Sequence, residues 1–144
     1  MIRLVVILLS ALWLAGCAGV IARQDAEYEN ADRLMKQRKY GEAASSFAKI
    51  AKDSAGTERG ARALFSEASS RAFFDNPHKD YALALQEFDE FLKKYPKSPM
   101  GRDAQNWRFI LKLVLELKKE NEQLTNNIDE LKRLDIRHEE RRRK

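Results

Sequence analysis

Few side chains in this 144-residue chain have the chemistry for covalent catalysis or metal binding. Cys17 is the only cysteine, and His78 and His138 are the only histidines, far apart in the sequence. The chain contains no His-Glu-x-x-His motif, no pair of cysteines and no phosphate-binding loop. Its Asp and Glu residues form no pair that would work as acid and base. We therefore expect a protein without enzymatic activity, metal or cofactor, whose one reactive group is the Cys17 thiol.

Cys17 follows a pattern that is typical of an export signal. Arg3 gives the N-terminus a positive charge, and an apolar run extends from Leu4 to Leu14. This run has about 11 residues, whereas a membrane-spanning helix needs about 20, so the segment is too short to be a span. The alternative interpretation is a buried helix with an incidental cysteine. Because a single cysteine excludes an intrachain disulfide, an exported chain of this kind must be stabilised by its core.

The sequence Leu-Ala-Gly-Cys that ends at Cys17 resembles the lipobox of bacterial lipoproteins. The resemblance implies that residues 1–16 are a signal peptide and that Cys17 is lipidated, with palmitate among its acyl chains, and becomes the new N-terminus. Residues 17–24 would then be a lipidated tether, and two or more acyl chains hold a protein stably on a bilayer. By the sorting rule of enterobacterial lipoproteins, Ala18 implies the periplasmic face of the outer membrane; the inner membrane is the alternative.

The composition favours helices over strands. Charged residues make up 34% of the chain, with only three prolines and six glycines, and Ala, Leu, Glu, Lys and Arg dominate after residue 21. The net charge is +5, with a basic excess in residues 133–144. Such an end binds nucleic acid, an anionic membrane surface or an acidic partner, or it complements the dipole of a helix C-terminus. Export argues against nucleic acid, so we expect no nucleic-acid partner.

Two sets of residues with identical spacing occur about 41 residues apart. Their members recur at i, i+3, i+7 and i+10, which places each set on one face of a helix. A small and a large apolar residue precede each set at helical spacing, so we expect two antiparallel helix pairs. The first unit comprises Ala31, Leu34, Tyr40, Ala43, Phe47 and Ile50, and the second comprises Leu64, Ala68, Tyr81, Ala84, Phe88 and Phe91.

These residues, with Pro96 in place of Phe91 in the second unit, resemble the signature of the tetratricopeptide repeat. Ile50 and Phe91 depart from that signature, because each replaces its usual small residue. The resemblance implies an all-α domain over residues 25–112, whose concave surface, formed by the first helix of each pair, binds a protein. The standard repeat has a period of 34 residues, which is shorter than the spacing of about 41 residues in this chain. We expect the additional residues to lie in the turns 54–60 and 75–79. Residues 80–107 resemble the repeat subtype of the lipoprotein of β-barrel assembly and of the Tol-Pal coordinator. That resemblance implies a subunit of outer-membrane protein assembly.

The turns contain residues that favour helix starts. Asn76-Pro77 and Ser98-Pro99 each offer an N-cap followed by a proline at the first helical position, so we expect helices to begin there. Thr57 is the expected cap of a helix that holds Arg59 to Phe74. Phe73 and Phe74 are adjacent and cannot both face one core. One of the two is therefore a candidate partner contact.

After residue 112 the apolar positions narrow to a seam. They alternate by three and four residues, as the a and d positions of a coiled coil do, and Asn121 occupies an a position, where a buried Asn fixes register. The seam fails at Asp135 and His138. We expect the helix of residues 113–144 to form a homodimer, to dock on a partner helix or to fold back onto its own repeats. The seam residues are Val114, Leu117, Asn121, Leu124, Ile128 and Leu131.

The end of this helix resembles the C-terminal helix of the outer-membrane lipoprotein that accompanies a sensor histidine kinase in enterobacteria. The resemblance rests on Leu131, Leu134, Asp135 and Ile136 and implies that they contact the periplasmic region of the kinase.

Taken together, the sequence predicts an all-α lipoprotein with tetratricopeptide-like helical hairpins followed by a long C-terminal helix. We expect a membrane-anchored adaptor that binds a protein in the cell envelope, as an accessory regulator of a two-component sensor kinase. The alternatives are a subunit of outer-membrane protein assembly and an envelope structural protein.

Overall fold

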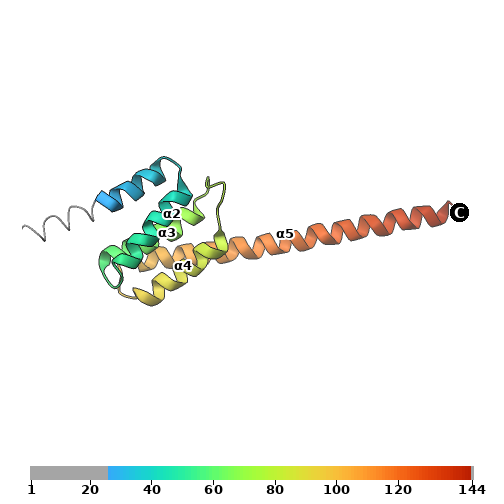
Figure 1. The fold of residues 1–144 in the computed structure, drawn as a ribbon. Helices are drawn as coiled ribbons and strands as arrows, with labels where there is room; N and C mark the ends of the chain where they lie inside the picture. The colour runs from blue at the N-terminus through green and yellow to red at the C-terminus, as the bar shows by residue number, and fades with distance from the viewer. Residues whose placement is uncertain (1–25, 144) are drawn as a thin grey trace, which may run out of the picture.

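The computed structural model describes residues 26–143, and every regular element among them is a helix (Figure 1). This confirms the predicted all-α fold with its long C-terminal helix. The expected signal peptide, Cys17 and the tether lie outside the described residues. A helical segment covers residues 26–36, and the labelled helices are α2 (Tyr40–Asp53), α3 (Glu58–Ala72), α4 (Tyr81–Lys94) and α5 (Gly101–Arg142).

Side-chain caps fix the starts of α3 and α4. Thr57 Oγ1 accepts a hydrogen bond from the backbone N–H of Gly60 at 3.1 Å, as its sequence position predicted. Asp80 Oδ1 accepts from the N–H of Leu83 at 2.9 Å. The prediction of a helix start at Asn76-Pro77 is wrong, because α4 begins only at Tyr81.

Asn76 instead organises the loop between α3 and α4. Its side chain is buried; Nδ2 donates to the carbonyl oxygen of Ser70 at 3.0 Å, and Oδ1 accepts from the N–H of His78 at 2.9 Å. A buried amide needs such partners, so both ends of the side chain are committed to the loop. The helix start expected at Ser98-Pro99 is also displaced, since α5 begins at Gly101.

Consecutive helices pack against one another in series, α2 on α3, α3 on α4 and α4 on the first part of α5 (Figure 1). Two apolar cores result. One joins residues 26–36, α2 and α3, and the other joins α3, α4 and α5; α3 contributes Ala63 to the first core and Leu64 to the second. Alanines on the facing helices allow close approach, and Phe47 and Phe88 fill the space between them.

The residues predicted to form the repeat core occupy these contacts. Leu34 and Tyr81 are partly buried and pack against the cores. The remaining residues are buried, and they are Ala31, Tyr40, Ala43, Phe47, Leu64, Ala68, Ala84 and Phe88.

Helix α5 packs on the globular part, residues 26–115, only through its N-terminal third. Ala104 and Leu111 are buried there, and Trp107 stacks on Phe88 with ring centroids 5.9 Å apart. Every residue from 116 to 143 is exposed, so the helix extends roughly 40 Å beyond the globular part (Figure 1). The expected arrangement in which this helix folds back onto its own repeats is therefore wrong. The expected boundary between residues 112 and 113 lies inside α5, which continues without a break.

Candidate interaction surfaces

The projecting part of α5 carries the apolar seam. Leu117, Leu124 and Leu131 are 53%, 60% and 64% exposed, and Ile128 is exposed between the last two. Val114, at the start of the seam, is partly covered by the globular part. Single exposed apolar side chains are ordinary on a protein surface, whereas a continuous line of large ones marks a binding surface.

The seam lies on a different side of α5 from the residues that pack on α4. Successive residues of an α-helix are about 100° apart, so Leu117 lies about 120° around the helix axis from the buried Leu111. Beyond Val114, the described core therefore leaves the seam uncovered. Near the globular part the apolar surface is widened by three further exposed residues, Phe109, Ile110 and Leu113.

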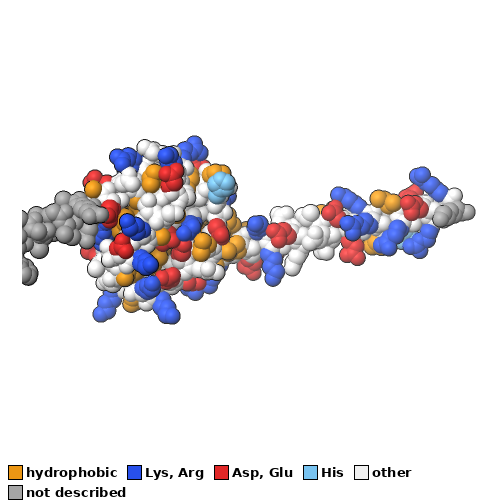
Figure 2. Space-filling view, in the orientation of Figure 1, with side chains coloured by type: hydrophobic (Ala, Val, Ile, Leu, Met, Phe, Trp, Pro, Cys, Tyr) orange, Lys and Arg blue, Asp and Glu red, His pale blue; other side chains and the backbone are white. Residues whose placement is uncertain are grey.

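The C-terminal end of α5 mixes apolar and charged side chains. Leu134 and Ile136 are exposed, and Asp135 interrupts the seam between them. Two ion pairs, Lys132 with Asp129 at 3.6 Å and Arg142 with Glu139 at 3.8 Å, lie on the exposed helix. Figure 2 shows basic and acidic side chains interspersed along this stretch. Exposed pairs of this kind contribute little to stability, so these charges act mainly on what approaches the helix.

The adjacent pair after α3 divides as the sequence predicted. Phe74 is 76% exposed, whereas Phe73 is partly buried and stacks on Tyr40 with centroids 5.2 Å apart. The Tyr40 hydroxyl donates to Asp75 Oδ1, and Asp75 Oδ2 pairs with Arg38 at 2.6 Å. These contacts fix the start of the loop and leave the Phe74 ring exposed.

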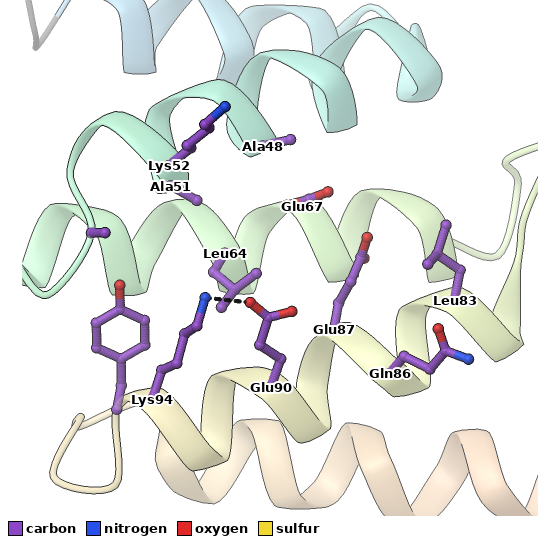
Figure 3. A pocket seen from close by; sticks show the side chains of 12 residues that line it. Ala48, Ala51, Lys52, Leu64, Glu67, Leu83, Gln86, Glu87, Glu90 and Lys94 are labelled. Carbon is purple, nitrogen blue, oxygen red and sulfur yellow. Dashed lines mark ion pairs between the residues drawn. The ribbon is translucent and has the colours of Figure 1, made fainter.

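A groove of about 450 Å³ runs between α2 and α4, with α3 as its floor (Figure 3). Its walls are therefore the second helices of the two hairpins. The sequence predicted a binding surface on the first helices instead. In Figure 3 Glu87 and Glu90 extend from α4 toward α3, and Glu90 pairs with Lys94 at 2.5 Å. Leu64 and Ala51 supply apolar lining.

A charge cluster joins α3 to α4 at one side of this groove. Arg71 Nε donates to Glu87 Oε1 at 2.6 Å, and Arg71 Nη2 donates to Glu67 Oε1 at 3.0 Å. Glu87 is only 7% exposed. Burial, reinforced by the neighbouring Glu67 carboxylate, raises the pKa of Glu87 to about 8, although Arg71 acts in the opposite direction. Near neutral pH the cluster therefore holds an extra proton.

The remaining candidate groups do not come together. His78 lies exposed in the α3–α4 loop and His138 lies exposed on α5. Among residues 26–143 no cluster of His, Cys, Asp and Glu is arranged to hold a metal ion. Within the same range, no helix has both the length and the apolar character that crossing a membrane requires.

Comparison of the chain with protein-family models, curated proteins and solved structures finds no match.

Proposed function

We propose that this chain is a lipid-anchored adaptor of the bacterial cell envelope, without enzymatic activity, that binds another polypeptide through α5. The observation that carries the proposal is the exposed seam on the projecting part of that helix. Leu117, Leu124 and Leu131 are more than half exposed although each is large and apolar. Burying them against a second helix would remove this surface from water, at about 25 cal/mol per Å².

The expected mode of binding is helix against helix. An isolated helix gains little stability from propensity alone, and most helices in proteins are stabilised by packing of an apolar face. The projecting stretch of α5 has such a face, and no part of residues 26–143 covers it. An apolar stripe at a and d spacing fits a coiled-coil partner or a groove that accepts a helix.

The anchor is the second part of the proposal, and its support is the sequence around Cys17. A tether of residues 17–24 would reach roughly 25 Å when extended, so the globular part would lie near the periplasmic face of the outer membrane. Helix α5 would add roughly 40 Å of reach. The adaptor would thus present its binding seam at a distance from the bilayer.

Paired variants on α5 test the proposal in native membranes. One variant carries Leu117→Glu and Leu124→Glu in the seam, and the other carries Gln123→Glu and Asn126→Glu on other exposed sides of the helix. Both add the same charge. After crosslinking and affinity purification, we expect the seam variant to lose the adducts formed by the native chain and the control to keep them. Equal adducts in all three chains, or none in any, would refute the proposal.

A regulator of a sensor histidine kinase is the narrower version of this function. It is favoured by Leu134 and Ile136, which are exposed and apolar but lie off the seam. Replacing both with serine would abolish co-purification of a kinase while leaving other adducts in place. If the serine variant loses no adduct, or if components of β-barrel assembly co-purify instead of a kinase, the alternative role in outer-membrane protein assembly is favoured. If the chain is an envelope structural protein, neither a kinase nor assembly components would co-purify with it. Binding of its basic end to the envelope would then depend steeply on salt concentration.

A further inference from the structure

We infer that the polypeptide bound by the α5 seam is a second copy of this chain, and that the two α5 helices pair in parallel and in register from Val114 to Leu131. The inference rests on the proposed function, in which that seam is the interaction surface. It specifies the partner, the direction of the pair and the layer that sets its register.

The residue types of the seam select two parallel strands. Its a positions hold Val114, Asn121 and Ile128, and its d positions hold leucine throughout. Branched Val or Ile at a combined with Leu at d is the arrangement that favours parallel dimers over trimers and tetramers. A sequence of this kind is complementary to itself, because each layer packs a residue against its own counterpart.

Asn121 sets the register. It is exposed in the structure and stands in the seam between Leu117 and Leu124. In a parallel, in-register pair the two Asn121 amides face each other and can exchange a hydrogen bond. In an antiparallel pair, or one shifted by a heptad, each amide would face an apolar side chain and lose its hydrogen bonds on burial. The polar layer thus disfavours the alternative pairings.

The geometry of the monomer leaves room for the second copy. The seam lies about 120° around the α5 axis from Leu111, which faces the globular part. A two-fold axis along the seam would therefore place the two globular parts on outward-facing sides of the pair. A parallel arrangement also puts both N-termini at one end, which suits two chains anchored in one membrane. Anchoring raises the effective concentration of the partner helix, which compensates for a seam of only about three heptads.

Flanking charges do not oppose the pairing. In a parallel pair, a g position of one helix approaches the following e position of the other. Glu120 then approaches Thr125, and Asn127 approaches Lys132, so no like charges meet. Partner helices of a different sequence are usually selected by complementary charges at these positions. This seam has no such selective pattern.

Disulfide formation in the full lipid-anchored chain tests the inference. Leu117→Cys and Leu131→Cys are introduced separately at d positions, with Lys119→Cys and Arg133→Cys as controls on the opposite side of the helix and with the same separation. After oxidation in membranes, we expect disulfide-linked homodimers from both d-position variants, at least tenfold above either control. Circular dichroism verifies that each variant keeps its helix content.

Two results would overturn the inference. Equal homodimer yields at d positions and controls would show random collision, and no homodimers at all would show that the seam does not meet its own copy. In the second case, seam-dependent adducts with a different protein would leave the proposed function intact. If seam-dependent adducts were also absent, both proposals would fail.

Discussion

The raised pKa of Glu87 makes the stability of this protein depend on pH in a defined direction. The pKa rises from 4.5 in an unperturbed carboxyl to about 8 in the fold, so the folded state binds the proton more tightly than the unfolded chain. Between these two values the folded state holds one more proton, and stability falls by roughly 1.4 kcal/mol for each pH unit gained. The contribution is fully present below about pH 4.5 and is lost by about pH 8, a total of a few kcal/mol.

The substitution Glu87→Gln removes the titrating group while keeping its shape. The amide oxygen can still accept from Arg71, and the amide nitrogen can donate to Glu67. We expect the variant to lose this pH slope, so that it is more stable than the native chain at pH 8–9 and close to it near pH 5. Urea unfolding at several pH values, followed by circular dichroism, measures the difference.

Glu90→Gln is the matched control on the same helix, since Glu90 is exposed and pairs with Lys94 across one turn. It should keep the pH slope of the native chain. If Glu87→Gln kept that slope as well, burial of the Glu67–Arg71–Glu87 cluster would not be the source of the pH dependence, and our account of the cluster would be wrong.

Packing determines the expected effect of four further substitutions. A Cβ at Gly60 would lie 2.2 Å from the backbone oxygen of Ser54, so Gly60→Ala should lower the free energy of unfolding by about 1–3 kcal/mol. A Cβ at Gly41 would meet no atom within 4 Å, so Gly41→Ala should raise the free energy of unfolding by about 0.5–1 kcal/mol. A lower urea midpoint for Gly41→Ala than for Gly60→Ala would contradict the packing at Gly60. Phe88→Ala should cost about 3–5 kcal/mol in thermal unfolding, because Phe88 is fully buried between Phe65 and Trp107. Phe74→Ala should change the free energy of unfolding by less than about 0.5 kcal/mol, since the ring is exposed. A large loss of stability in this variant would show that Phe74 is packed.

The repeat core was predictable because it depends on local periodicity. The spacing of Tyr40, Ala43 and Phe47 places them on one helix face, and burial of that face follows from the apolar character it shares with the next helix. The cap at Thr57 was predictable for the same reason, since its bond reaches only three residues along the chain. Exposure of one residue of the pair Phe73-Phe74 needed no tertiary information either.

Features that depend on contacts between helices were not predictable. Asn76 has the residue type of a helix cap, but its side chain instead donates to the buried carbonyl oxygen of Ser70 in the last turn of α3. The Glu67–Arg71–Glu87 cluster contains a visible i,i+4 pair, yet Glu87 comes from another helix and no local signal links it to Arg71. In α5 apolar residues surround the helix near Leu111, so periodicity alone does not decide which side packs on α4.

We propose that one side of α5, and no other, determines what this protein binds. A photo-crosslinking residue placed in turn at each position from 114 to 131 of the membrane-anchored chain tests it most directly. We expect adduct yields that rise and fall with the seven-residue repeat, with maxima at Leu117, Leu124 and Leu131 and minima at Lys119 and Asn126. Yields without this period, or no adducts at any of these positions, would contradict it.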